Sequence, residues 1–189
     1  MKLKATILTL LFISFVSFSV YAQNSAVSHK INVDVPEVAL LGLVAESSKE
    51  ITVSAVAPNE AGSAVDFSLK NKDHIWINYS SILSKSTQKR KVIATVQGEI
   101  PAGVTLNVQA SEYSGAGKGK LGKSAGVVTL SNQPTDVIVD IGSCFTGKGV
   151  NNGHYLTYQL QQKTSSVDYA QLSQSQIAVN VVYTLTDYN

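Results

Sequence analysis

Short segments in which apolar and polar residues alternate one by one recur along most of this sequence. Residues 104–111 alternate Val, Leu, Val and Ala with Thr, Asn, Gln and Ser, and residues 177–186 continue the same pattern for longer. Successive side chains of a β-strand point to opposite faces, so this pattern predicts half-buried strands. Further segments of this kind lie at residues 31–35, 38–45, 50–57, 64–69, 74–80, 90–97, 126–131, 136–141 and 156–160.

Glycine, proline and asparagine separate these segments, as at Pro101-Ala102-Gly103 and between Gly147 and Gly153. Only a short helical turn is expected, near residues 169–172, and parallel sheets need longer crossover helices. A chain of 189 residues suits a single domain. We therefore predict an all-β fold. It is one antiparallel β-sandwich, immunoglobulin-like or pilin-like, with about ten short strands over residues 37–189.

The first 22 residues have the organisation of a secretory signal peptide. Lys2 and Lys4 precede an apolar stretch at residues 7–20, and Val20 and Ala22 occupy the −3 and −1 positions of a cleavage site. An anchoring membrane helix is the alternative, but the stretch is shorter than the roughly 20 residues of a span. We expect residues 1–22 to be cleaved, which predicts an exported protein with no membrane span in its mature form.

The charge balance changes when the signal is removed. The whole chain has a formal net charge of +2, with 15 Lys and Arg against 13 Asp and Glu. Two of the lysines and none of the acids lie in residues 1–22, so the mature chain has equal numbers of basic and acidic side chains. A neutral chain has no general attraction for nucleic acids or anionic membranes. We therefore expect no nucleic-acid partner.

Residues 115–124 read GAGKGKLGKS and match the phosphate-binding pattern G-x-x-x-x-G-K-[ST]. That motif works at the start of a helix, where backbone N–H groups surround a phosphate. Here Gly126 and several β-branched residues follow, which favours another strand and a flexible hairpin loop over a nucleotide site. Lys118, Lys120 and Lys123 are candidates for an exposed contact with an acidic surface.

Signals for catalysis are sparse. None of the histidines, His29, His74 and His154, has a zinc-binding spacing, and no G-x-S-x-G elbow is present. Cys144 and His154 flank a glycine-rich turn and could meet across a hairpin as nucleophile and base. Cys144 otherwise reads as a buried small side chain, one half of an intermolecular disulfide, or a reactive thiol. We predict no catalytic, cofactor-binding or metal-binding residue, no cofactor, and no enzymatic activity.

Trp76 is the only tryptophan of the chain and lies in the segment IWINY. Alternation places Trp76 on the same face as His74 and Asn78, opposite Ile75 and Ile77. Tryptophan more often packs in a core, but an exposed indole would provide a platform on which a sugar ring can stack. Trp76 is therefore a candidate surface contact for a glycan.

The two ends of the mature chain carry strand-like segments, at residues 26–35 and in the terminal stretch IAVNVVYTLTDYN. In this arrangement the chain resembles the subunits of chaperone–usher pili and their coat-protein relatives. The resemblance implies a sandwich that lacks one strand and is completed by the N-terminal extension of a neighbour, here residues 23–36. It also implies self-association, or binding of an assembly chaperone, through edge strands.

The resemblance assigns two sets of residues. The donor side chains would be Val27, Ile31, Val33 and Val35. The side chains that line the groove or meet a chaperone would be Val179, Val181, Tyr183 and Leu185. Many members of the family carry a cysteine pair that joins early strands, whereas this chain has only Cys144. The stretches IGSCFTG and LTYQL also look like uncharacterised secreted proteins of Gram-negative bacteria, which implies a location in the periplasm, at the cell surface or outside the cell.

Three functions stay open on the sequence alone. The first is an exported, non-enzymatic structural subunit of a surface or pilus-like fibre, assembled by strand addition. The second is a self-contained cell-surface binding module, for a carbohydrate or a protein. The third is a hydrolase that uses Cys144 and His154. In the simplest alternative to strand exchange, both ends of the chain pair inside one complete sandwich.

Overall fold

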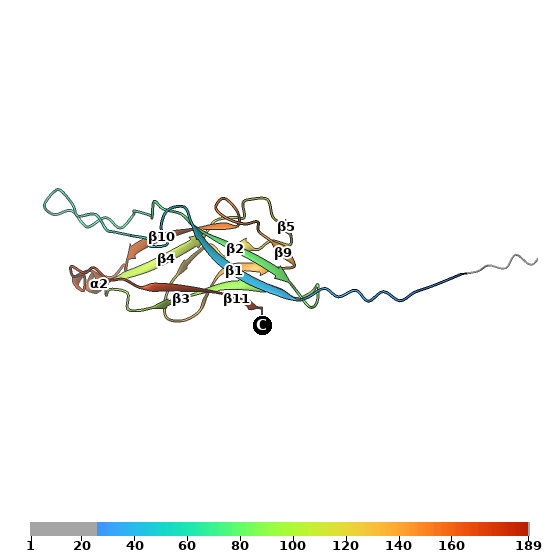
Figure 1. The fold of residues 1–189 in the computed structure, drawn as a ribbon. Helices are drawn as coiled ribbons and strands as arrows, with labels where there is room; N and C mark the ends of the chain where they lie inside the picture. The colour runs from blue at the N-terminus through green and yellow to red at the C-terminus, as the bar shows by residue number, and fades with distance from the viewer. Residues whose placement is uncertain (1–25, 189) are drawn as a thin grey trace, which may run out of the picture. The chain divides into compact units, whose positions relative to one another are not determined.

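The computed structural model describes residues 26–188, so the predicted signal peptide at residues 1–22 lies outside the described part. The chain divides after Asp34, and the residues from Val35 onward form the body of the fold. Two antiparallel sheets, of seven and four strands, carry nearly all of its regular structure (Figure 1). The prediction of an all-β sandwich is therefore confirmed.

The larger sheet contains β1 (Val38–Ala45), β2 (Ile75–Ile82), β4 (Val104–Ala110), β5 (Lys118–Gly119), β7 (Val127–Thr129), β9 (Cys144–Phe145) and β10 (His154–Gln162). The smaller sheet contains β3 (Arg90–Gln97), β6 (Lys123–Ser124), β8 (Thr135–Ile141) and β11 (Asn180–Asp187). The helix α2 (Ser166–Ala170) begins at the N-cap Ser165, whose hydroxyl accepts the N–H of Asp168.

The order of the strands makes β1 and β11 edge strands. The larger sheet runs β5-β9-β2-β10-β4-β7. β9 and β10 pair with different parts of one edge of β2, and β1 pairs with the opposite edge along its whole length. The smaller sheet runs β11-β3-β8-β6. β1 pairs with β2 from Val38 opposite Ile82 to Ala45 opposite Ile75. β11 pairs with β3 from Asn180 opposite Gln97 to Asp187 opposite Arg90.

The core lies between the inward faces of the two sheets. In β3, for example, Val92, Ala94 and Val96 are buried, while the residues between them are partly exposed. The other strands supply the remaining core side chains, among them Ile75, Ile77, Tyr79, Val108, Ala110, Val137, Ile138, Ile141 and Leu156. Each fully buried aliphatic side chain contributes about 1.5–3 kcal/mol to the stability of the fold. The inward-facing residues of the alternating segments therefore supply the apolar contacts that hold the two sheets together.

Three of the predicted strands are wrong. Residues 31–35 form no strand, and residues 50–57 and 64–69 meet only in a single bridge between Val56 and Asp66. A period-two pattern shows that a segment can line an apolar surface, but a strand also needs a neighbour for its N–H and C=O groups. The strands β5, β6 and β9 were not predicted, because they have two residues each and are too short to show a pattern.

Arg90, the first residue of β3, ties the two edge strands together. Its side chain is 5% exposed; Nε donates to Asp187 at the end of β11 over 2.9 Å, and Nη2 donates to Glu37 just before β1. The remaining acceptors are the carbonyl oxygens of Val38 and Ile82 and the hydroxyl of Ser81. One buried guanidinium therefore links β1, β2, β3 and β11.

We expect Arg90→Met to lower the free energy of unfolding by about 2–4 kcal/mol, because two carbonyls and a hydroxyl lose their charged donor. Lys91→Met is the matched control, since Lys91 pairs with the partly exposed Asp136 and should cost less than about 1 kcal/mol. Urea denaturation measures both. Equal stability of the two variants would show that Arg90 does not hold the edges together.

Candidate functional site

The outer edge of β11 is open. β11 pairs with β3 along its whole length on one side, and no strand of residues 26–188 pairs with it on the other. The N–H and C=O groups along that edge are therefore free to bond to another extended chain. Such an edge is a template for strand addition unless the fold covers or blocks it.

The position of this edge follows from the strand order. In a seven-stranded immunoglobulin sandwich, strands A, B, E and D form one sheet, and C, F and G form the other. β1, β2, β10 and β4 match A, B, E and D, and β3 and β11 match C and F, both in chain order and in pairing. The open side of β11 is thus the side on which strand G lies in a complete sandwich.

Half-covered apolar side chains lie along this edge. Val179, Val181, Tyr183 and Leu185 pack against the core, yet each keeps some exposed surface. The facing edge strand β1, which lies next to β11 (Figure 1), adds Leu41, Leu43 and Ala45 in the same condition. The structure thus brings together the four residues singled out from the sequence, three of them on β11 and Val179 just before it. It adds the β1 residues, whose alternation was visible but whose place beside β11 was not.

A tyrosine pair fixes β11 to the opposite sheet. The Tyr183 hydroxyl lies 2.7 Å from that of Tyr158 on β10. Burial raises the pKa of Tyr158 to about 12 and holds the pKa of Tyr183 well above its usual range. Both groups stay protonated at any physiological pH, so β11 keeps its position while its outer edge stays open.

The N-terminal segment carries the four predicted donor side chains in exposed positions. Residues 26–37 contain no strand or helix, and Val27, Ile31, Val33 and Val35 are exposed by 95%, 69%, 84% and 68%. From Ile31 to Val35 the apolar side chains alternate with Asn32 and Asp34. This segment has the pattern of a strand and no strand partner among the described residues.

The glycine-rich run forms short strands rather than a phosphate loop. β5 and β6 lie within it, and no helix follows it, so the geometry that a bound phosphate needs is missing there. A Cβ added at Gly117 would lie 2.2 Å from the carbonyl oxygen of Phe145, and one at Gly119 would lie 2.3 Å from that of Ser143. The glycines are therefore explained by close packing of the run against β9.

Lys118, Lys120 and Lys123 are exposed, as the sequence predicted. A nearby carboxylate, Asp140, bonds to Lys89. That hydrogen bond, with the charges of Lys123 and Lys120, lowers the pKa of Asp140. The patch therefore keeps an excess of positive charge around one acid, and nothing in the structure identifies a partner for it.

We expect Gly117→Ala to destabilise the fold by about 1–3 kcal/mol, because the added methyl group overlaps a backbone oxygen. Gly42→Ala is the control, since a Cβ at Gly42 meets nothing within 4 Å. Urea denaturation compares the two. If Gly117→Ala unfolds at the same urea concentration as Gly42→Ala, close packing does not explain the run.

Cys144 and His154 do not meet. They lie opposite Ser81 and Ile77 of β2, which are four residues and about 13 Å apart along the strand. Both ring nitrogens of His154 have other partners, Tyr79 and the carbonyl of Ser111. The structure thus gives the proposed nucleophile and base no hydrogen bond. Burial also raises the pKa of the Cys144 thiol to about 11, which keeps it in its unreactive form.

We expect the Cys144 thiol to resist labelling by a thiol-specific disulfide reagent at neutral pH and to react quickly once urea unfolds the chain. A matched control moves the cysteine to an exposed loop, as Lys148→Cys in a Cys144→Ser background, which should react in the folded state. Absorbance of the released thiolate follows both reactions. Rapid labelling of folded wild-type protein would contradict the burial of Cys144.

Trp76 is buried, as tryptophan more often is, so the exposed stacking platform that the sequence left open is not formed. Its side chain is 6% exposed because β2 is a central strand, with Val44 beside it on β1 and Tyr155 beside it on β10. The Tyr155 ring packs edge-on at 5.5 Å between centroids, and Nε1 of Trp76 lies 3.5 Å from a carboxylate oxygen of Glu46. Trp76 is part of the packing on the outer face of the larger sheet.

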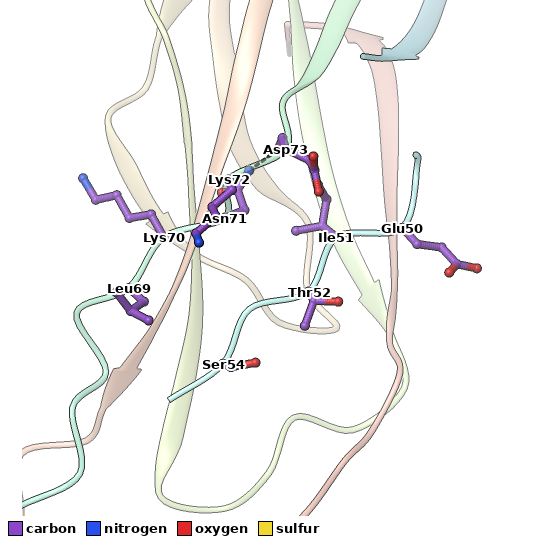
Figure 2. A pocket seen from close by; sticks show the side chains of 9 residues that line it. All are labelled: Glu50, Ile51, Thr52, Ser54, Leu69, Lys70, Asn71, Lys72 and Asp73. Carbon is purple, nitrogen blue, oxygen red and sulfur yellow. Dashed lines mark hydrogen bonds between the residues drawn. The ribbon is translucent and has the colours of Figure 1, made fainter. Parts of the chain in front are cut away.

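A surface pocket of about 300 Å³ lies in the connection between β1 and β2. Figure 2 shows the side chains that line it, from residues 50–52 and 54 on one segment and residues 69–73 on the other. Its lining mixes Glu50 and Asp73 with Lys70 and Lys72, so it has no dominant charge. Nowhere in residues 26–188 do three acidic, histidine or cysteine side chains gather as ligands for a metal ion.

No protein-family model matches this sequence, and no curated protein or solved structure matches it. Within the described part, no helix has the length and apolar character needed to cross a bilayer. The open edge of β11 and the exposed N-terminal segment are therefore the features of the chain itself from which a function can be inferred.

Proposed function

We propose that this chain is an exported, non-enzymatic structural subunit of a surface or pilus-like fibre and assembles by strand addition. Each copy would lend its residues 26–36 to the open edge of β11 in the next copy. The observation that carries this proposal is the unpaired edge of β11, at the position where strand G closes an immunoglobulin sandwich.

The N-terminal segment matches that edge in length and pattern. An incoming strand must place apolar side chains on the half-covered strip between β11 and β1 and polar ones toward solvent. Residues 31–35 alternate in this way, and Val27 adds a further apolar side chain. Each aliphatic side chain that becomes fully buried would contribute about 1.5–3 kcal/mol, in addition to the backbone hydrogen bonds of the new strand pair.

The two other functions have less support. The carbohydrate-binding module rests on the eight tyrosines of the chain and on a possible exposure of Trp76, and the Trp76 side chain is buried. The hydrolase was motivated by Cys144 and His154, which do not contact each other. An assembly chaperone that covers β11 before polymerisation is compatible with strand addition, because it would use the same edge.

We expect the double variant Ile31→Asp and Val33→Asp to lose SDS-resistant multimers, because carboxylates cannot be buried on an apolar strip. The fraction of multimer should fall more than about tenfold, since about 1.4 kcal/mol already changes an equilibrium tenfold. The measurement is gel electrophoresis of unheated and heated samples, after export in a Gram-negative host with the chain's own residues 1–22.

Asn32→Asp is the matched control, because it adds a charge to the opposite face of the same segment and should keep the multimers. A chain without residues 24–35 should export but not form a ladder, and a peptide of residues 24–36 should raise its melting temperature. The proposal is wrong if wild-type protein is a monomer, or if the deletion or the double aspartate variant leaves the ladder unchanged.

A further inference from the structure

His154 and Tyr79 form a polar contact inside the core that takes no part in the proposed strand addition. The His154 side chain has no exposed surface, and Tyr79 is 3% exposed. The Tyr79 oxygen lies 3.0 Å from Nε2 of His154 and accepts the N–H of Gly122 over 2.9 Å. On the other side of the ring, Nδ1 lies 2.7 Å from the carbonyl oxygen of Ser111.

These partners determine which nitrogen carries the proton. The Ser111 carbonyl can only accept, so Nδ1 of His154 carries the hydrogen of that bond. Tyr79 then donates its O–H to the bare Nε2, while its oxygen accepts the N–H of Gly122. Each donor in this chain of bonds has an acceptor only while the His154 ring is neutral.

Two tyrosine hydroxyl groups, of Tyr79 and Tyr113, hold the two ends of residues 117–122. This segment contains β5 and leads into β6. Gly122 is bound by Tyr79, and Gly117 donates its N–H to the hydroxyl of Tyr113. Tyr113 in turn donates to the carbonyl of Thr146 over 3.2 Å and packs edge-on to the His154 ring, with centroids 6.0 Å apart. Further anchoring comes from the pairing of β5 with β9 and from Lys120, whose N–H donates to the carbonyl of Ser143 over 3.1 Å and whose carbonyl accepts the N–H of Gly142 over 2.8 Å.

A second proton on His154 would break this arrangement. It would place an N–H at Nε2 against the Tyr79 oxygen, and the Tyr79 O–H would have no acceptor among its hydrogen-bond partners in the described part. The titratable groups nearby are Tyr79 on β2, Tyr113 and Glu112 after β4, and Cys144 on β9 beside Tyr79. Of these, only Glu112 would favour the charged ring.

We propose that His154 and Tyr79 form an acid-sensitive latch that holds residues 117–122, with the exposed Lys118 and Lys120, against the body. Proton uptake by His154 loosens the segment and leaves the rest of the sandwich folded. The latch would let a fall in pH change the mobility of this lysine-bearing surface.

The direction of the effect follows from linkage. Burial, only partly opposed by the bond to Ser111 and the charge of Glu112, lowers the pKa of His154 in the folded protein. The closed state therefore binds fewer protons than the open one. Its stability is complete above the ordinary histidine pKa of about 6.5 and decreases as the pH falls below it, by up to about tenfold in the opening equilibrium for each pH unit.

Hydrogen–deuterium exchange of the mature protein, corrected for intrinsic rates, tests the latch from about pH 7.5 to about pH 4.5. We expect peptides that cover residues 117–122 to lose protection below the ordinary pKa of histidine, while peptides from β3 and β11 keep theirs. His154→Gln should abolish the acid response, because a glutamine amide can donate to Ser111 and accept from Tyr79 without titrating.

His74→Gln is the matched control, since His74 is partly exposed and its loss should leave the acid response intact. If His154→Gln does not fold, Tyr79→Phe and imidazole ¹⁵N shifts take its place. Tyr79→Phe should expose Gly122 to exchange even at neutral pH, and wild-type His154 should show the Nδ1–H tautomer. In the exchange experiment, three results overturn the proposal: an unchanged acid response in His154→Gln, wild-type protection that does not vary with pH, or an equal loss of protection in β3 and β11. A Gly122 amide that stays protected in Tyr79→Phe also overturns it. So does an Nε2–H tautomer of His154 in the wild-type protein.

Discussion

The Arg90 guanidinium is buried, and the start of edge strand β1 and the end of edge strand β11 both bond to it. A guanidinium has five N–H donors in a fixed plane, and a buried one is tolerated only when nearby groups accept from them. Glu37 before β1 and Asp187 at the end of β11 supply the charged acceptors. The first and last strands of the body are thereby held at one end, and the spacing of the two sheets is defined there.

Away from Arg90, the buried polar side chains have hydrogen-bond partners, whereas the backbone groups along the outer edge of β11 have no strand partner in the described part. In the described part, every buried side-chain nitrogen or oxygen has a hydrogen-bond partner. Tyr158 bonds to Tyr183, and Tyr79 bonds to His154. The open edge of β11 is therefore not the result of a poorly formed core. Among the described residues, the core is well packed while the outer side of β11 has no strand partner.

Alternation predicted the long strands well and missed the two-residue strands β5, β6 and β9. β1 and β3 begin and end where the pattern does, because a strand with one face against a core must alternate. The segment 50–57 has an equally good pattern and is not a strand, since pattern describes a surface and pairing requires a neighbour. The glycine run was correctly separated from a phosphate loop, but its close approach to β9 depends on contacts far along the chain.

The candidate site divides in the same way. The four apolar residues between 179 and 185 and the four of the N-terminal segment could be named from their alternation and from the family resemblance. The role of Arg90 could not, because its partners are 8 to 97 residues away along the chain. The position of Trp76 was also open on sequence, since a central strand can be covered on both faces and alternation then no longer separates core from surface.

By itself the sequence determined the all-β class, the positions of most of the main strands and the side chains that face inward, because these depend on residues next to each other in the chain. Only the tertiary structure decided which strand edges stay open, whether Cys144 meets His154, and which charge lies at the junction of the two sheets. Those outcomes depend on which strands from distant parts of the chain pair with each other and in which register. The alternation of residues within one segment does not show which other segment it pairs with.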